Sequence, residues 1–263
     1  MKGHDVLNGT AAKIRTVVTD DPKEQELEAI RELCRSADEY DGTRYGAPDD
    51  ADLYLLLYRE KVLIAYLAAY GMGETHHGRP LTEIAACTRP EERKKGCFTI
   101  LLDALSKETE GNAVLRFAVN EIQVTAAVLS GLGAVRDHAE LMMCLPLAEY
   151  AEPKGQPGNC KVEKTETEDG AEEYYCHSVY SECRVRIYGE RAYIYGVLTC
   201  AGQRRKHRAE TLLRELFGWL PKKKCTEVFL EVSDRNEAAM GLYRKLGFEV
   251  SERISYYLLE GQI

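Results

Sequence analysis

The sequence lacks several features that would place it in a particular class of protein. No apolar run approaches ~18 residues, and the N-terminus lacks the apolar core of a signal peptide. No Gly-x-Ser-x-Gly segment offers a nucleophile elbow. The net charge is −8, which argues against broad nucleic-acid binding. We therefore expect a globular cytoplasmic protein that binds neither membranes nor nucleic acid.

Cysteine and histidine lack the spacing of a metal or redox site. The chain has nine Cys but no Cys-x-x-Cys pair, so reduced and mostly buried thiols explain them best. His76 and His77 are neighbours, but no Cys or carboxylate partner stands at ligand spacing from them. We predict no metal site.

The length suits two small domains. The chain has 263 residues, of which 44% are hydrophobic and 30% charged, as is ordinary for globular proteins. The stretch from Pro146 to Gly158 holds three Pro and two Gly and little apolar sequence, which is typical of a linker. We predict an N-terminal module at 1–147, a linker at 148–158 and a C-terminal module at 159–263.

The segment from Val228 to Phe248 combines a strand and a short helix. The apolar run from Val228 to Val232 predicts the strand, and a Ser/Asp/Asn cluster follows it. Gly247 ends the helix, because glycine tolerates a left-handed backbone. The apolar positions at helical spacing are Ala239, Leu242, Tyr243 and Leu246. From this pattern alone, Tyr243 is either a functional group or a core aromatic.

A basic turn precedes that segment. A β-run from Ala192 to Thr199 enters the turn, and an amphipathic helix follows it. The N–H groups at a helix start point in one direction, and the helix dipole adds partial positive charge there. The turn also carries the basic side chains Arg204, Arg205, Lys206 and Arg208. We predict an anion site, and the alternative is a solvated basic face.

The same order of elements occurs in the first half of the chain. A β-run from Glu83 to Thr88 leads into a basic turn, and a helix, a strand and a second helix ending at Gly133 follow. The turn consists of Arg93, Lys94, Lys95, Gly96, Cys97 and Phe98. The fold class is therefore α/β (α+β), with two modules that each pack helices on a mixed, mostly antiparallel sheet.

Both copies resemble the GNAT superfamily of N-acetyltransferases, and their tandem layout is similar to that of mycothiol synthase. The two turns resemble the family's pyrophosphate loop, and the strand, Asn and Leu-Tyr helix resemble its segment beside the acyl-CoA thiol. The resemblance implies acetyl-CoA as co-substrate. In the C-terminal module it implies contacts from Val197, Leu198, Thr199, Arg204, Arg205, Lys206, His207, Arg208, Ala209, Asn236 and Tyr243. In the N-terminal module it implies contacts from Arg93, Lys94, Lys95, Gly96, Cys97 and Phe98.

The resemblance also implies catalytic roles. Tyr243 would protonate the departing thiolate, and the strand from Val197 to Thr199, bulged in the family, would direct N–H groups at the thioester oxygen. Glu83 resembles the strand glutamate that serves as base in histone acetyltransferases of the superfamily; the alternative is a solvent-facing glutamate. Glu190 and Glu231 are near the second site in sequence, but the sequence does not orient them.

The copies depart from the family pattern in different places. His207 stands where a Gly usually lets the backbone approach the phosphates, and Leu129 stands where a Tyr would fall in the first module. Only the first module has a segment, from Asp21 to about Asp50, long enough for a helix pair. We place the live site in the C-terminal module, because a missing hydroxyl cannot be replaced locally.

The predicted reaction is acetyl transfer from acetyl-CoA to a primary amine of a small molecule or peptide by direct attack. Two other possibilities stay open: a catalytically weak acyl-CoA-binding or regulatory protein, and a pseudo-dimer whose first module only completes the pocket of the second. We expect a monomer, with a homodimer as the alternative. Fold analogy does not name the acceptor.

Overall fold

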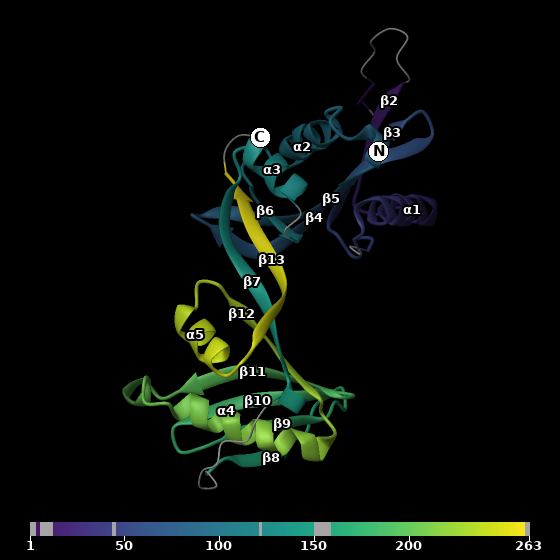
Figure 1. The fold of residues 1–263 in the computed structure, drawn as a ribbon. Coiled ribbons are helices and arrows are strands. Elements are labelled where there is room, and N and C mark those ends of the chain that lie inside the picture. Colours follow the sequence, from purple (N-terminus) through teal and green to yellow (C-terminus); the bar gives the residue numbers. More distant parts are fainter. Residues whose placement is uncertain (1–3, 6–12, 44–45, 121–122, 150–158, 261–263) are drawn as a thin grey trace. The chain divides into compact units, whose positions relative to one another are not determined.

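The protein consists of two compact units. The computed structural model describes residues 4–5, 13–43, 46–120, 123–149 and 159–260. The first unit is Met1–Asp137 with Ser255–Ile263, and the second is His138–Ile254. Figure 1 labels their elements. Among the described residues, no helix combines the length and the apolar sequence that a membrane span requires.

The first unit is a mostly antiparallel sheet with packed helices. Its strands are β1 (His4–Asp5), β2 (Ile14–Thr19), β3 (Leu53–Arg59), β4 (Val62–His76), β5 (Arg79–Thr88) and β6 (Val114–Asn120). Its helices are α1 (Glu24–Asp41), η1 (Pro90–Glu92), α2 (Cys97–Glu108) and α3 (Gln123–Gly131). The strands lie in chain order, with the end of β13 (Glu249–Leu259) beside β6. β5 and β6 are parallel, whereas the ladders from β1 to β5 are antiparallel.

Both faces of this sheet are covered. Leu55 and Leu57 of β3 pack with residues of α2 and α3, whereas Leu56 packs with residues of α1. Successive side chains of a strand point to opposite faces. A strand buried on both faces therefore needs a continuous apolar run, which β3 and β4 both have.

The second unit has helices on one face of its sheet. Its strands are β7 (Val135–Pro146), β8 (Lys161–Thr165), β9 (Glu173–His177), β10 (Ser181–Tyr188), β11 (Arg191–Thr199) and β12 (Glu227–Ser233). Its helices are η2 (Leu147–Glu149), η3 (Ala201–Gln203), α4 (Arg208–Trp219), η4 (Leu220–Lys223) and α5 (Glu237–Lys245). The strand order is β13-β7-β12-β11-β10-β9-β8. Figure 1 shows α4 lying along β9, β10 and β11.

The strands of the second unit alternate between a covered and an uncovered face. Leu230 and Val232 of β12 belong to the core that α4 and α5 complete. Phe229 and Glu231 alternate with them and so point to the other face. Within the described residues, no hydrophobic core cluster lies on that other face.

The boundaries of the units differ from the predicted ones. From the sequence we expect Val135–Pro146 in the N-terminal module. The residues of β7 from Glu140 onward instead pair with β12 inside the second unit. The end of β13, from Ser255, belongs to the first unit. Most of the predicted linker, residues 150–158, lies outside the described residues. Strand partners are set by tertiary pairing, which a local pattern does not encode.

The described part of the segment from Asp21 to Asp50 contains one helix instead of the predicted pair. α1 starts with the N–H of Lys23 donating to Oε2 of Glu26 at 2.8 Å, and it ends at Gly42, whose φ is 70°. Residues 44–45 lie outside the described residues, and residues 46–50 are not helical. Pro48 accounts for this in part, because proline disfavours helix in the residue before it.

Candidate functional site

The two predicted phosphate loops have the same backbone conformation. Arg204 and Arg93 both have φ of −64° and follow a short η helix. The Nε of each donates to the carbonyl of the last residue of the preceding strand, at 3.3 Å and 3.2 Å respectively. Two left-handed residues come next: Arg205 and His207 in the second unit, and Lys94 and Gly96 in the first. The two loops therefore repeat one local backbone conformation.

Each loop opens the first turn of a helix, where N–H groups have no intrahelical partner and can bind an anion. In the second unit the side chains of Arg205, Lys206 and Arg208 are exposed around these groups. In the first unit Cys97 is buried, and Phe98 packs on Phe117 with ring centroids 6.2 Å apart. For Cys97 and Phe98, therefore, only the backbone N–H groups are placed to contact an anion, and the side chains are not.

The arginine that begins each loop has different partners in the two units. Arg93 donates to both carboxylate oxygens of Asp41 at 2.7 Å. This bond lowers the pKa of Asp41. Arg204 makes no such ion pair within the described chain, and its bond to Thr199 uses only Nε. The terminal N–H donors of Arg204 are thus open to a ligand, whereas those of Arg93 are already engaged.

His207 takes the left-handed position that favours glycine, with φ of 57°. Its Nδ1 lies 2.8 Å from Oε2 of Glu210, and Nζ of Lys245 lies 2.6 Å from the same oxygen. The Lys245 bond is the largest of the effects that lower the pKa of Glu210 to about 2. The carboxylate stays ionised and ties α5 to the first turn of α4. We did not predict this cluster, although the spacing of His207 and Glu210 on one helix face was a usable signal.

The parallel strands β11 and β12 separate soon after they begin. In the described chain their pairing ends at Tyr193 and Phe229, while β11 continues to Thr199 and β12 to Ser233. The backbone groups along the inner edges of the separated parts have no ladder partner across the gap. A ligand can therefore hydrogen-bond there as an added strand would.

A β-bulge lies in β11 just beyond this point. Gly196 and Val197 together oppose Cys183 of β10, and Gly196 has φ of 61°. A bulge leaves a residue outside the regular ladder. We expected a bulge in the strand from Val197 to Thr199, and the structure has one at Gly196 and Val197. Leu198, whose side chain is exposed, and Thr199 then rejoin the ladder with β10.

The first unit has the separation but not the bulge. β5 pairs with β6 only from Leu81 to Ile84. From Ile84 to Thr88, however, β5 pairs with β4 without interruption. Within the described residues, therefore, only the second unit has a bulge beside the separation of its parallel strands.

Tyr243 lies on α5 in the core of the second unit. Its exposed fraction is 7%, and its ring centroid is 5.8 Å from that of Phe248. Burial raises the pKa of Tyr243 to about 12, so the hydroxyl keeps its proton at neutral pH. Asn236 caps the same helix, because its Oδ1 accepts from the N–H of Ala239 at 3.1 Å. In the first unit, Leu129 of α3 is equally buried and has no hydroxyl.

Glu83, the predicted base of the first unit, is held in an ion pair. Its Oε2 accepts from Nε and Nη2 of Arg116 at 2.9 Å and 2.8 Å. The two residues face each other in the β5–β6 ladder. The guanidinium of Arg116 also lies over the ring of Tyr256. This geometry supports a structural role for Glu83.

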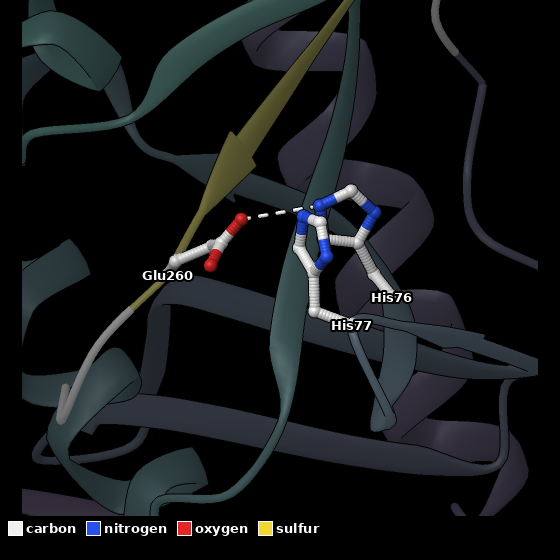
Figure 2. A group of neighbouring side chains, drawn as sticks. All are labelled: His76, His77 and Glu260. Atoms are coloured by element: carbon white, nitrogen blue, oxygen red, sulfur yellow. Dashed lines mark ion pairs between the residues drawn. The ribbon is translucent and has the colours of Figure 1, made fainter.

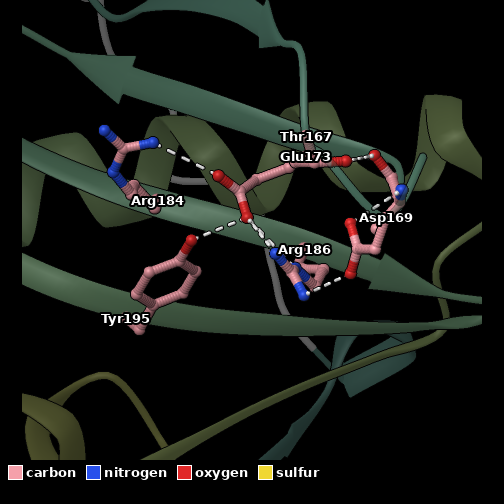
Figure 3. A network of polar contacts seen from close by, with 7 residues as sticks. Thr167, Asp169, Glu173, Arg184, Arg186 and Tyr195 are labelled. Carbon is pink, nitrogen blue, oxygen red and sulfur yellow. Dashed lines mark hydrogen bonds and ion pairs between the residues drawn. The ribbon is translucent and has the colours of Figure 1, made fainter.

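A second carboxylate is fixed on the uncovered face of the second unit (Figure 3). Glu173 accepts from the hydroxyl of Tyr195 at 2.7 Å, from Nε of Arg186 at 3.0 Å and from Nη1 of Arg184 at 3.2 Å. These contacts, with the Tyr195 bond as the largest, lower the pKa of Glu173. The guanidinium groups of Arg184 and Arg186, on the same face, thus pair with the Glu173 carboxylate.

His76 and His77 meet a carboxylate that the sequence spacing did not reveal (Figure 2). Nε2 of His76 lies 3.1 Å from Oε1 of Glu260, and one ligand atom from each of the three residues lies within 4.8 Å of the others. Our premise that the pair has no carboxylate partner was wrong. Imidazole and carboxylate are zinc ligands, but Arg79 holds the other oxygen of Glu260 at 2.7 Å. Glu260 is thus held by contacts with both His76 and Arg79.

Solved structures of GNAT proteins have a fold similar to that of this chain. The chain is similar to a GCN5-related N-acetyltransferase from Sphaerobacter thermophilus, with TM-score 0.63 and 15% identity over 93% of this chain and 95% of that one. It is similar to a tandem GNAT protein from the clavulanic acid biosynthesis pathway, with TM-score 0.62 and 12% identity over 94% and 98%. A glucosamine N-acetyltransferase region of a fungal multi-domain β-N-acetylglucosaminidase gives TM-score 0.65 and 10% identity over 93% and 38%.

At these identities the similarity shows only the fold. The match in sequence to a protein family is a separate finding. No curated protein was found to match the chain. Residues 169–248, which include β11, the basic loop and α5, match the model of the acetyltransferase (GNAT) family. The chain therefore carries a GNAT-family acetyltransferase domain at residues 169–248, within the fold of tandem GNAT proteins.

Proposed function

We propose that this protein transfers an acetyl group from acetyl-CoA to a primary amine of a small molecule or peptide, at a site in the second unit. The observation that carries the proposal is the bulge at Gly196 beside the separation of β11 and β12, with Tyr243 on the helix that follows. The first unit repeats the loop and the separation but has neither the bulge nor the tyrosine.

The residues of the second unit supply the needs of thioester aminolysis. The loop from Arg204 to Ala209 would hold the pyrophosphate through backbone N–H groups and arginine donors. The backbone N–H groups at the Gly196 bulge would stabilise the charge that develops on the thioester oxygen. Tyr243, still protonated at neutral pH, would give its proton to the departing thiolate.

The first unit supports a different role. Its loop has the anion-binding conformation, but Arg93 is paired with Asp41, and Leu129 has no proton to give. We assign it acyl-CoA binding at most. We expect the protein to act in the cytoplasm as a monomer, with a homodimer as the alternative.

Calorimetry with acetyl-CoA, followed by a screen for release of free thiol, tests the proposal. We expect a dissociation constant in the micromolar range typical of metabolite sites. We expect thiol release with one or more of simple amines, amino acids, aminoglycosides and N-terminal peptides. Absence of heat with acetyl-CoA and with CoA would refute the proposal. Binding without thiol release from any amine would favour the regulatory alternative.

A further inference from the structure

One carboxylate near the separation of β11 and β12 contacts no basic side chain among the described residues. Glu231 is exposed and lies two residues beyond Phe229, where the pairing ends. In the described chain, Glu231 contacts the hydroxyl of Tyr193, which lies 3.5 Å from Oε2 of Glu231. By contrast, Glu227 on the same face of β12 pairs with Arg191 at 2.6 Å. Within the described chain, no basic side chain thus contacts the Glu231 carboxylate at the place where the two strands part.

Aromatic rings accompany this carboxylate. Tyr193 and Tyr195 stack with centroids 5.5 Å apart. Phe229 lies 5.2 Å from Tyr193, and its own ring already carries the guanidinium of Arg191, 4.4 Å from the centroid. All three rings are partly exposed on the uncovered face. Aromatic faces attract cations, and an unpaired carboxylate does so more strongly. The chemistry of this patch therefore favours an organic cation with an apolar body.

The side chains of Glu231 and Tyr243 lie on opposite faces of the same sheet. Leu230 and Val232, which flank Glu231 on β12, share the core under α4 and α5 with Tyr243. Glu231 points the other way. Direct transfer uses a base for the incoming amine and an acid for the departing sulfur, and these two residues can supply them.

We propose that Glu231, Tyr193 and Tyr195 form the acceptor subsite, that the acceptor is a primary ammonium on an apolar or aromatic body, and that Glu231 is its base. This inference rests on the proposed function and deepens it. Glu231 takes a proton from the ammonium and passes it to solvent. The neutral amine then forms the C–N bond as the C–S bond breaks.

Tyr243 protonates the sulfur, and its phenolate regains a proton that leaves the nitrogen. The ammonium and acetyl-CoA together yield an amide, the CoA thiol and one released proton. Glu231 is thereby regenerated as a carboxylate. No oxidant or further reactant is needed.

The test uses benzylamine as the probe and benzyl alcohol as its neutral counterpart. Calorimetry on the full-length protein without acetyl-CoA measures binding of each, so this arm does not depend on the proposed function. We expect the wild type to bind benzylamine in preference to benzyl alcohol. Glu231→Gln should weaken benzylamine binding at least about tenfold, because it removes the charge that opposes the ammonium. Glu227→Gln is the matched control and should retain binding.

Turnover supplies the second readout. Glu231→Gln should lower kcat with benzylamine or the best amine found by about a hundredfold or more. The dissociation constant of acetyl-CoA should stay within about twofold, because Glu231 acts on the acceptor alone. Equal benzylamine binding by wild type and Glu231→Gln, or no binding by the wild type, overturns the inference. If the wild type does not bind acetyl-CoA, the proposed function is overturned instead.

Discussion

A tyrosine that protonates a thiolate must keep its own proton until the thiolate forms. Burial does this for Tyr243, whose pKa is raised to about 12. The same burial makes the residue part of the core, so its sequence pattern is that of a packing residue. At Tyr243, burial in the core and the proposed role as an acid are therefore compatible.

Tyr243→Phe separates the two contributions. The substitution removes one oxygen and keeps the ring, so we expect the fold to be retained. Turnover should fall about a hundredfold, as for loss of a general acid. The acetyl-CoA dissociation constant should change by less than about twofold, because the hydroxyl acts only as the thiolate leaves. Steady-state kinetics and calorimetry measure both, and near wild-type turnover when chemistry limits the rate would leave Tyr243 a core aromatic only.

At the scale of elements, Glu210 connects the helix that opens at the phosphate loop with the helix that carries Tyr243. Lys245 of α5 and His207 at the start of α4 both contact its carboxylate. The connection fixes Tyr243, the proposed acid, relative to the loop, and His207 makes a side-chain contact there that glycine could not make. It also makes this contact sensitive to pH.

Glu210→Gln should lower the free energy of unfolding by roughly 1 kcal/mol at neutral pH, the upper range for ion pairs of this kind. The folded pKa of Glu210, about 2, lies below its ordinary value of 4.5. Its stabilising effect is therefore present above about pH 4.5 and is lost as the pH falls toward about 2. Urea denaturation at several pH values should show the variant and the wild type converging in acid. The exposed Glu237→Gln at the start of α5 is the control, and a difference that persists in acid would contradict this account.

At the scale of the whole molecule, local patterns predicted the repeat but not the strand partners. The strand, basic turn and helix around Arg93 and Arg204 are encoded by neighbouring residues, and the structure has both. The passage of β7 into the second unit depends on its pairing with β12, which is a tertiary choice. Glu231 could be named from the sequence but not oriented, because its direction follows from the register of β12. Glu260 meets His76 only through the fold.

The central claim is that the second unit holds the active site although both units have the same loop. Arg205 and Lys94 test it as a matched pair, because both are exposed, left-handed and equivalent in the two loops. Arg205→Glu and Lys94→Glu therefore carry the same backbone cost and the same reversal of charge.

The decisive measurement is the acetyl-CoA dissociation constant and turnover of these two variants, each first shown to be folded by circular dichroism. The account predicts that Arg205→Glu weakens binding at least about tenfold, because it places a negative charge where phosphate binds. Turnover should fall with it, while Lys94→Glu keeps both within about twofold. Loss of binding and turnover in Lys94→Glu, with Arg205→Glu unaffected, would contradict the account and place the active site in the first unit.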